Sequence, residues 1–142
     1  MVEEKSKKVL IISSRIENIK LVDSFIDEIF SEFQFSEQFY GNVLISVHEA
    51  VSNAIQHGNK RNPDKKVKIT SYREGECLVI CVEDEGNGFD HTTLPDPTKD
   101  ENLEKPYGRG IFLISNLTDK FEFSNNGRKI EMRFNYKNPK VV

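Results

Sequence analysis

The sequence predicts an α+β fold, a two-layer sandwich in which a mostly antiparallel mixed sheet carries its helices on one face. Three observations support this class. A strand-like stretch near the start is followed by two stretches with helical periodicity, strand-like stretches return in the middle, and the chain ends in a strand pair joined by a tight turn. A chain of 142 residues can bury one core, so we expect one domain over residues 1–142.

The first half of the chain is expected to form one strand and two helices. Residues 9–12 are apolar and form the expected strand. Ser14 and Glu17 have the spacing of a capping box, which predicts the start of the first helix. The apolar residues of that helix recur at helical spacing: Val22, Phe25, Ile26, Ile29, Phe30 and Phe33. The second helix is expected from Ser36 to about His57, where the following glycine can end it.

The second half is expected to form strands, a long loop, a short helix and a hairpin. Residues 67–72 alternate as in a half-exposed strand, whereas residues 77–82 are apolar on both faces, as in a central strand. The stretch from Gly86 to Gly108 lacks periodicity, and a loop of that length is typical of a lid or binding loop. A short helix over 108–117 follows, and Asn126-Gly127 predicts the type I′ turn of a final hairpin.

Composition excludes several classes of function. The net charge of -3 offers no basic excess, so we expect neither nucleic acid nor a membrane as a direct partner. No apolar run approaches the roughly 20 residues of a membrane span, and the N-terminus does not resemble a signal peptide. Cys77 and Cys81 fall four residues apart in one predicted strand, too far for a disulfide. Reduced thiols fit the cytoplasmic location that we expect.

Polar side chains gather on one side of the second expected helix. At about 100° per residue, Glu49 and Asn53 lie one turn apart and reach the same spot. A carboxylate beside a carboxamide can act as a general base next to an oxygen ligand for Mg²⁺. The alternative is a solvated helix flank. His57 lies at the edge of this face, where a helix cap or a partner of the helix dipole is the alternative.

A glycine-bearing loop leaves the end of the expected central strand. Asp84 begins this loop, and Gly86, Gly88 and Phe89 follow. A carboxylate there can accept a hydrogen bond from an exocyclic amine such as that of adenine, and the glycines let the backbone approach a flat ring. The alternative is an acidic turn, and the ligand spacing of an EF-hand is absent.

A second pair of glycines opens the short helix after the long loop, in the run Gly108, Arg109, Gly110 and Ile111. The free N–H groups and positive dipole of a helix N-terminus favour phosphate, and the guanidinium of Arg109 adds a fork of donors. The alternative is a glycine hinge with a surface arginine. A P-loop, a dinucleotide fingerprint and the second histidine of a zinc-protease helix are all absent from the sequence.

Together, three segments resemble the N, G1 and G2 boxes of the GHKL (histidine-kinase-like) ATPase superfamily. They are Glu49-Ala-Val-Ser-Asn53-Ala-Ile-Gln-His57-Gly58, Asp84-Glu-Gly86-Asn-Gly88-Phe89 and Gly108-Arg-Gly110-Ile-Phe-Leu-Ile114. Their order and separation are similar to those of the superfamily, over nearly the whole chain. The Glu-Ala-x-x-Asn-Ala-x-x-His-Gly run is typical of the branch of anti-sigma-factor serine/threonine kinases.

The resemblance implies the Bergerat ATP-binding fold, with ATP and Mg²⁺ as cofactors. It implies that Glu49 is the catalytic base for an acceptor serine, that Asn53 is the Mg²⁺ ligand and that Asp84 holds the adenine amino group. Residues 90–107 would form the ATP lid. The other nucleotide-binding residues that it implies are His57, Gly86, Gly88, Phe89, Gly108, Arg109, Gly110 and Ile111.

By the same resemblance, the chain is expected to be an anti-sigma factor with protein serine kinase activity. Such a protein sequesters a sigma factor and phosphorylates its antagonist, an anti-anti-sigma protein. Two alternatives stay open: a nucleotide-dependent binding module with little or no kinase activity, and a catalytic module of a two-component histidine kinase system. Whether the chain forms a homodimer is open as well.

Overall fold

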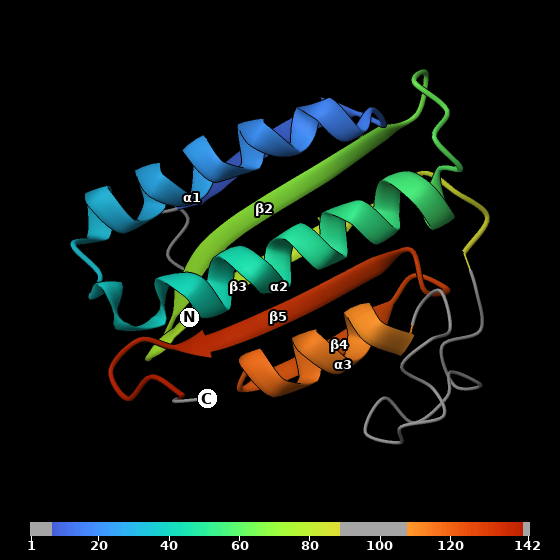
Figure 1. The fold of residues 1–142 in the computed structure, drawn as a ribbon. Coiled ribbons are helices and arrows are strands. Elements are labelled where there is room, and N and C mark those ends of the chain that lie inside the picture. Colours follow the sequence, from blue (N-terminus) through green and yellow to red (C-terminus); the bar gives the residue numbers. More distant parts are fainter. Residues whose placement is uncertain (1–6, 89–107, 141–142) are drawn as a thin grey trace.

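The computed structural model describes residues 7–88 and 108–140. In these ranges five strands form one sheet in the order β1-β2-β3-β5-β4, and the helices cover one face of it (Figure 1). The predicted α+β two-layer sandwich is therefore confirmed. Every strand pairing within the described ranges is antiparallel, so the sheet there is simpler than the expected mixed one.

The strands follow the predicted order along the chain. β1 (Lys8–Ser13) lies at one edge and pairs with β2 (Lys66–Glu74). β3 (Cys77–Glu83) is the central strand, as predicted from its two apolar faces, and pairs with β2 and β5 (Lys129–Asn135). β4 (Lys120–Ser124) forms the other edge.

The helical layer contains α1 (Ile19–Phe33), α2 (Tyr40–Asn53) and α3 (Gly108–Leu117). A 3₁₀ turn, Glu37–Phe39, precedes α2, and a π-helical turn, Ala54–Gly58, continues it. The predicted second helix is confirmed in its extent, but three kinds of helical turn share it. The π-helical turn, which is wider than an α-helical turn, contains His57, the predicted site residue nearest the end of this helix.

The core lies between the helices and the inner face of the sheet. Alternation along β2 turns Val67 and Ile69 inward, and apolar side chains of all three helices pack on this layer. The largest fully buried side chains are Phe39, Phe134, Ile26, Ile29, Ile55, Ile69, Leu78, Ile80, Ile114 and Met132. Because α2 and α3 both pack on this core and on each other, the polar side of α2 is held against the start of α3.

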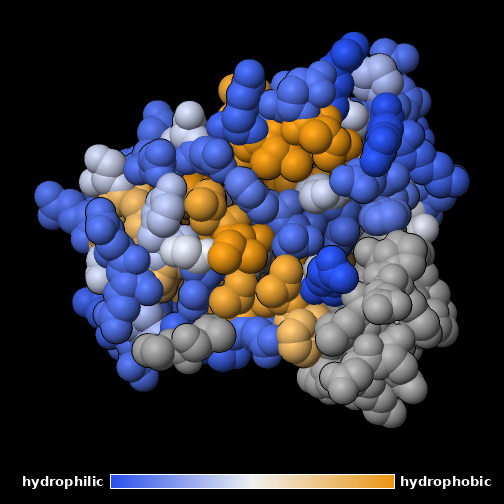
Figure 2. Space-filling view, in the orientation of Figure 1, coloured by the Kyte–Doolittle hydropathy of each residue, from blue (hydrophilic) through white to orange (hydrophobic). Residues whose placement is uncertain are grey.

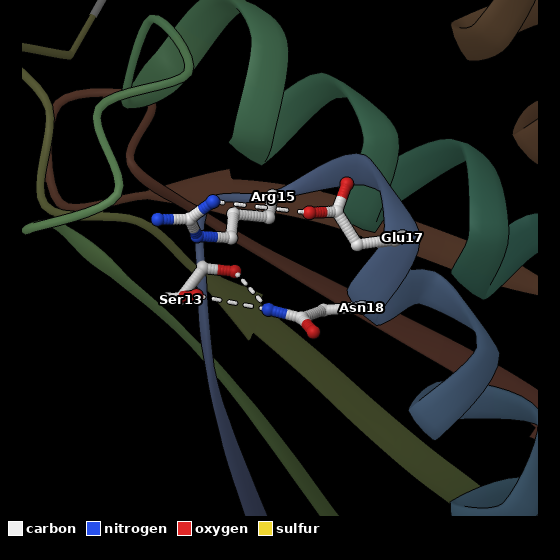
Figure 3. Close-up of polar contacts among 4 residues, drawn as sticks. All are labelled: Ser13, Arg15, Glu17 and Asn18. Atoms are coloured by element: carbon white, nitrogen blue, oxygen red, sulfur yellow. Dashed lines mark hydrogen bonds and ion pairs between the residues drawn. The ribbon is translucent and has the colours of Figure 1, made fainter.

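The junction between β1 and α1 differs from the capping-box prediction. The Ser14 hydroxyl is buried and donates to the Lys65 carbonyl at 2.6 Å, so it caps no helix. A 3₁₀ turn, Ile16–Asn18, precedes α1 without a side-chain cap. Asn18 turns back to β1, where its Nδ2 donates to the carbonyl and the hydroxyl of Ser13 at 3.1 and 2.9 Å (Figure 3). The predicted capping box is wrong because Ser14 has a tertiary partner instead of a local one.

The final hairpin has the predicted turn chemistry in a longer loop. Asn126 and Gly127 have φ values of 59° and 85°, and the Arg128 N–H donates to the Asn125 carbonyl at 3.2 Å. Asn125 also has a positive φ, 52°, so the loop between the paired ends of β4 and β5 covers residues 125–128. This loop reaches the candidate site described below.

Cys77 and Cys81 are free thiols, as predicted. Burial raises the pKa of both thiols. Both therefore stay protonated and poorly nucleophilic at neutral pH.

The outer surface of the helical layer is largely hydrophilic, with hydrophobic patches between the charged groups (Figure 2). Exposed large hydrophobic residues occur in two places. Ile16, Leu21 and Ile45 belong to the helical layer, whereas Val9 and Ile11 belong to the edge strand β1. Within residues 7–88 and 108–140, no helix combines the length and the apolar character needed to cross a membrane.

Candidate functional site

The first turn of α3 lies against the polar side of α2. A Cβ atom placed on Gly110 would lie 3.1 Å from both Glu49 Oε2 and Asn53 Nδ2. Such a distance is tighter than most Cβ contacts, so a larger residue here would force Glu49 or Asn53 to shift by a few tenths of an ångström. The structure thus places the predicted base and the predicted Mg²⁺ ligand next to the predicted phosphate-binding turn.

The loop after β3 packs on the end of the π-helical turn. The Gly86 N–H donates to Asp84 Oδ1 at 2.8 Å, which fixes the carboxylate over its own turn. A Cβ on Gly58 would overlap the Asp84 carboxylate, and a Cβ on Gly86 would overlap the Gly58 carbonyl. Both glycines are therefore required by close packing at this point. The second helix and the loop after β3 meet here, as their predicted roles in one site require.

Asp84 occupies an environment that opposes its ionisation. Burial raises the pKa of this carboxyl group, while the Gly86 N–H and the charges of Arg128 and Lys65 act in the opposite direction. A half-buried carboxylate of this kind is a typical feature of ligand sites. It can accept a hydrogen bond from an amine in an environment from which water is partly excluded.

A pocket lies between the contact at Gly110 and the turn at Asp84. Its walls come from α2, the loop after β3, α3 and the final hairpin. Its lining residues are Ala50, Asn53, Ala54, His57, Gly58, Val82, Asp84, Gly88, Ile111, Ile114, Phe123, Gly127, Arg128 and Ile130. Most of this lining is apolar, and Asn53, His57, Asp84 and Arg128 add polar groups. An apolar pocket with a few polar groups suits a flat aromatic ring that carries hydrogen-bonding substituents.

Most of the predicted site residues therefore come together in the structure. The predicted residues that line the pocket are Asn53, His57, Asp84, Gly88 and Ile111. Glu49, Gly86 and Gly110 support it through the contacts described above. Gly108 opens α3, and Arg109 is exposed in its first turn. Phe89 and the predicted ATP lid, 90–107, lie outside the described residues.

The hairpin end of the pocket was not predicted from the sequence. Phe123, Gly127 and Arg128 reach the pocket because β5 pairs with β3, with Lys129 opposite Glu83. Gly88 has a φ of 80°, and a Cβ on it would overlap the Asn126 carbonyl. The Asn-Gly signal revealed the turn, but only the sheet order reveals that this turn borders the loop after β3.

The π-helical turn was also missed, because an apolar and polar pattern does not distinguish it from an α-helix. It carries Ala54, His57 and Gly58 into the pocket lining. Single π-helical turns within α-helices occur frequently at functional sites.

Comparisons with known proteins agree with this geometry. A family described as the histidine kinase-like ATPase domain matches residues 12–134. The serine-protein kinase RsbW of Staphylococcus aureus strain JH9 is 30% identical over 125 residues, covering 82% of this chain and 78% of the relative. The RsbW of strain Newman gives the same values. A further Staphylococcus aureus RsbW is 30% identical over 112 residues, or 73% of this chain and 70% of that protein.

Proposed function

Because the chain belongs to the histidine kinase-like ATPase domain family, we propose that it is a protein serine kinase that binds Mg-ATP in this pocket. One observation carries the proposal: Gly110, in the first turn of α3, lies directly against both Glu49 and Asn53. A base, a metal ligand and the N-terminus of a helix at one end of an apolar pocket are the parts that phosphoryl transfer from a nucleotide requires. The name of the similar staphylococcal proteins, serine-protein kinase, supports the same activity.

In this proposal the nucleotide lies along the pocket. The adenine ring packs on the apolar lining beside Gly86 and Gly88, and its amino group donates to the Asp84 carboxylate. The phosphates point toward the start of α3, where the backbone N–H groups and Arg109 favour negative charge. Residues 90–107 keep the predicted role of ATP lid, and Phe89 that of a nucleotide-binding residue.

Asn53 is proposed to hold Mg²⁺ through its carboxamide oxygen. Mg²⁺ is commonly bound by one or two protein oxygens together with substrate phosphates, so one carboxamide suffices as a protein ligand. The first turn of α3, where the phosphates are proposed to bind, lies directly beside this side chain at Gly110. The bound ion would neutralise phosphate charge and orient the phosphates.

Glu49 is proposed to act as the general base. Its carboxylate accepts the proton of an acceptor serine hydroxyl as the serine oxygen bonds to the γ-phosphorus. The bond between that phosphorus and the β–γ bridging oxygen breaks, and ADP leaves with this oxygen. The place of Glu49 beside Gly110 puts the base next to the proposed phosphate-binding turn.

The proposed partners follow from the resemblance of the sequence to anti-sigma-factor kinases. We propose that the acceptor serine belongs to an anti-anti-sigma antagonist and that the chain also sequesters a sigma factor. We further propose a homodimer, for which the edge strand β1 supplies the physical argument given in the Discussion.

Incubation with labelled ATP, Mg²⁺ and candidate anti-anti-sigma proteins tests the kinase proposal. We expect label on a serine of the acceptor, and about 10²- to 10⁴-fold slower labelling by Glu49→Gln, which keeps the size of the side chain but removes the base. ATP binding by this variant should match that of the wild type. ATP binding without label on any candidate would favour the binding module. Acid-labile, alkali-stable label would favour the histidine kinase system.

A further inference from the structure

Asn59 is a buried polar residue beside the site, and the proposed reaction does not use it. It is 1% exposed and follows the π-helical turn, whose Ala54 carbonyl accepts its backbone N–H at 2.8 Å. Its side-chain Nδ2 donates to Ser14 Oγ at 2.8 Å and to the Lys66 carbonyl at 2.9 Å. Its Oδ1 accepts the backbone N–H of Glu85 at 2.8 Å.

These hydrogen bonds connect segments that are far apart in the sequence. Ser14 follows β1, Lys66 begins β2, and Glu85 belongs to the loop after β3. Two further hydrogen bonds close the network: Ser14 donates to the Lys65 carbonyl at 2.6 Å, and the Lys66 N–H donates to the Glu85 carboxylate. Both hydrogens of the Asn59 amide and its oxygen are used, so this buried side chain is fully satisfied.

We propose that Asn59 is a positioning residue for the recognition of adenine, an inference that rests on the proposed binding of ATP. Glu85, which Asn59 holds by its N–H, separates Asp84 from Gly86. Gly86 in turn donates to the Asp84 carboxylate and packs on the carbonyl of Gly58, the residue before Asn59. The orientation of the Asp84 carboxylate therefore depends on the turn over residues 84–86, which Asn59 holds through the Glu85 N–H.

In this arrangement the residues that recognise adenine are separate from those proposed for phosphoryl transfer. Asn53 and Glu49 lie on α2 against Gly110, about two and three helical turns before Asn59. Releasing Glu85 from Asn59 loosens the Asp84 turn but leaves that contact in place. Adenine presents an amine where guanine presents an oxygen, so the preference for ATP over GTP reports directly on the position of the Asp84 acceptor.

Two substitutions of Asn59 separate its acceptor from its donors. Asn59→Asp keeps an oxygen for the Glu85 N–H but loses both donors, whereas Asn59→Ala loses all three side-chain hydrogen bonds. Ser14→Ala, a matched control, removes only the outer part of the network. The quantities to measure are kcat and KM for ATP and GTP in the presence of an acceptor, and the melting temperature.

We expect the preference of Asn59→Ala for ATP over GTP to be about tenfold smaller than that of the wild type. This loss should appear in the KM for ATP, and kcat should change by less than about twofold. Asn59→Asp should melt at a lower temperature than the wild type yet keep most of the preference. Ser14→Ala should lower the melting temperature without changing the preference. The proposal is overturned if Asn59→Ala melts early but keeps the full preference, or if its kcat falls as much as its kcat/KM.

Hydrogen exchange of the nucleotide-free protein tests the network without relying on ATP. The Glu85 amide of the wild type should be protected, although its residue is exposed. In Asn59→Ala its exchange should accelerate at least tenfold, while amides of β3 exchange as before. An unprotected Glu85 amide in the wild type overturns the inference even if the variants do not fold. A wild type that shows this protection but binds no ATP refutes the proposed function alone.

Discussion

At the scale of the residue, Asp84 combines two opposing requirements. Burial raises its pKa, so the folded protein holds the proton of this carboxyl group more tightly than the unfolded chain does. The contribution of Asp84 to the free energy of unfolding therefore increases as the pH falls through its raised pKa and decreases as the pH rises. The proposed adenine contact has the opposite dependence, because only the ionised carboxylate is purely an acceptor.

ATP affinity should accordingly decrease as the pH falls through the raised pKa of Asp84. Asp84→Asn should lower ATP affinity by about tenfold and remove this part of the pH dependence, since its amide does not titrate. Calorimetric titration with ATP from neutral to weakly acidic pH measures both effects. Asp64→Asn, the same change at an exposed turn, is the control and should bind like the wild type. Unchanged affinity in Asp84→Asn would rule out the adenine contact.

Asn53 offers a second test at this scale. Asn53→Ala should abolish the increase in ATP affinity that Mg²⁺ brings, because the proposed oxygen ligand is lost. The measurement is ATP affinity with Mg²⁺ and with a chelator. Asn42→Ala is the matched control on the same helix, where the Asn42 amide donates to the Lys140 carbonyl at 2.9 Å. Tight Mg-dependent binding by Asn53→Ala would mean that the metal ligand lies elsewhere.

At the scale of the element, α3 contacts the predicted site residues of α2 through Gly110, a residue without a side chain. Gly110 brings the start of α3 against Glu49 and Asn53, whereas a Cβ atom placed on Gly41, at the opposite end of α2, would have nothing within 4 Å. The two glycines therefore have different physical roles. Gly110 lies in close contact with two predicted site residues, whereas Gly41 is only an exposed helical residue with a poor helix propensity.

Alanine at the two positions should change different properties, stability at Gly41 and function at Gly110. Gly41→Ala should raise the free energy of unfolding by about 0.5–1 kcal/mol through helix propensity and leave ATP binding unchanged. Gly110→Ala should displace Glu49 or Asn53 and reduce both ATP affinity and phosphoryl transfer, because its methyl group would press on both side chains. Chemical denaturation and labelled-ATP transfer measure the two effects. Equal transfer by the two variants would contradict the proposed place of the phosphates.

The elements themselves were largely predictable, because their signals are local. Alternation along β2 and the two apolar faces of β3 predict strands at the observed places, and the helical spacing of apolar residues predicts α1 and α2. Ser14 was misread because its partner, the Lys65 carbonyl, is distant in the sequence. The π-helical turn could not be predicted, because its side-chain pattern is close to that of an α-helix.

The candidate site was predictable only in part, because contacts between distant segments leave no local pattern in the sequence. The order of the three motifs predicted that Asp84 and Gly110 would serve one pocket. In the structure Asp84 lines the pocket, and Gly110 lies against Asn53, another lining residue. The contribution of Arg128 depends on the register between β3 and β5, which no local pattern encodes. Asn59 was overlooked because a polar residue after a glycine reads as an exposed loop, whereas it is buried by contacts with distant segments.

At the scale of the whole molecule, the two edges of the sheet differ in character. The outer edge strand β4 exposes Lys120 and Glu122, charges of the kind that discourage pairing with another strand. The opposite edge strand, β1, exposes Val9 and Ile11, at 48% and 59%. An antiparallel second copy centred on Leu10 would place each Val9 opposite an Ile11 and join the two apolar pairs into one strip. This self-complementarity favours a two-fold dimer through β1.

Ile11→Lys should convert this proposed dimer to a monomer, because it places a charge in the centre of the apolar strip. Ile45→Lys is the matched control, since Ile45 is a similarly exposed isoleucine, at 45%, on α2. Light scattering after size-exclusion chromatography measures the mass of each variant. A monomeric wild type, or a dimer that survives Ile11→Lys, would exclude pairing through β1.

The pairing of β1 with β2 has a consequence for the order of folding. β2 with β3, and β4 with β5, are neighbours along the chain and can form as local hairpins. β1 pairs with β2 only across both long helices, as in the match of Lys8 with Ser71, so closing that contact costs more chain entropy. The strand proposed to join two subunits therefore docks late, as does the similarly distant pairing of β3 with β5. Assembly of the proposed dimer would therefore follow the completion of this sheet in each subunit.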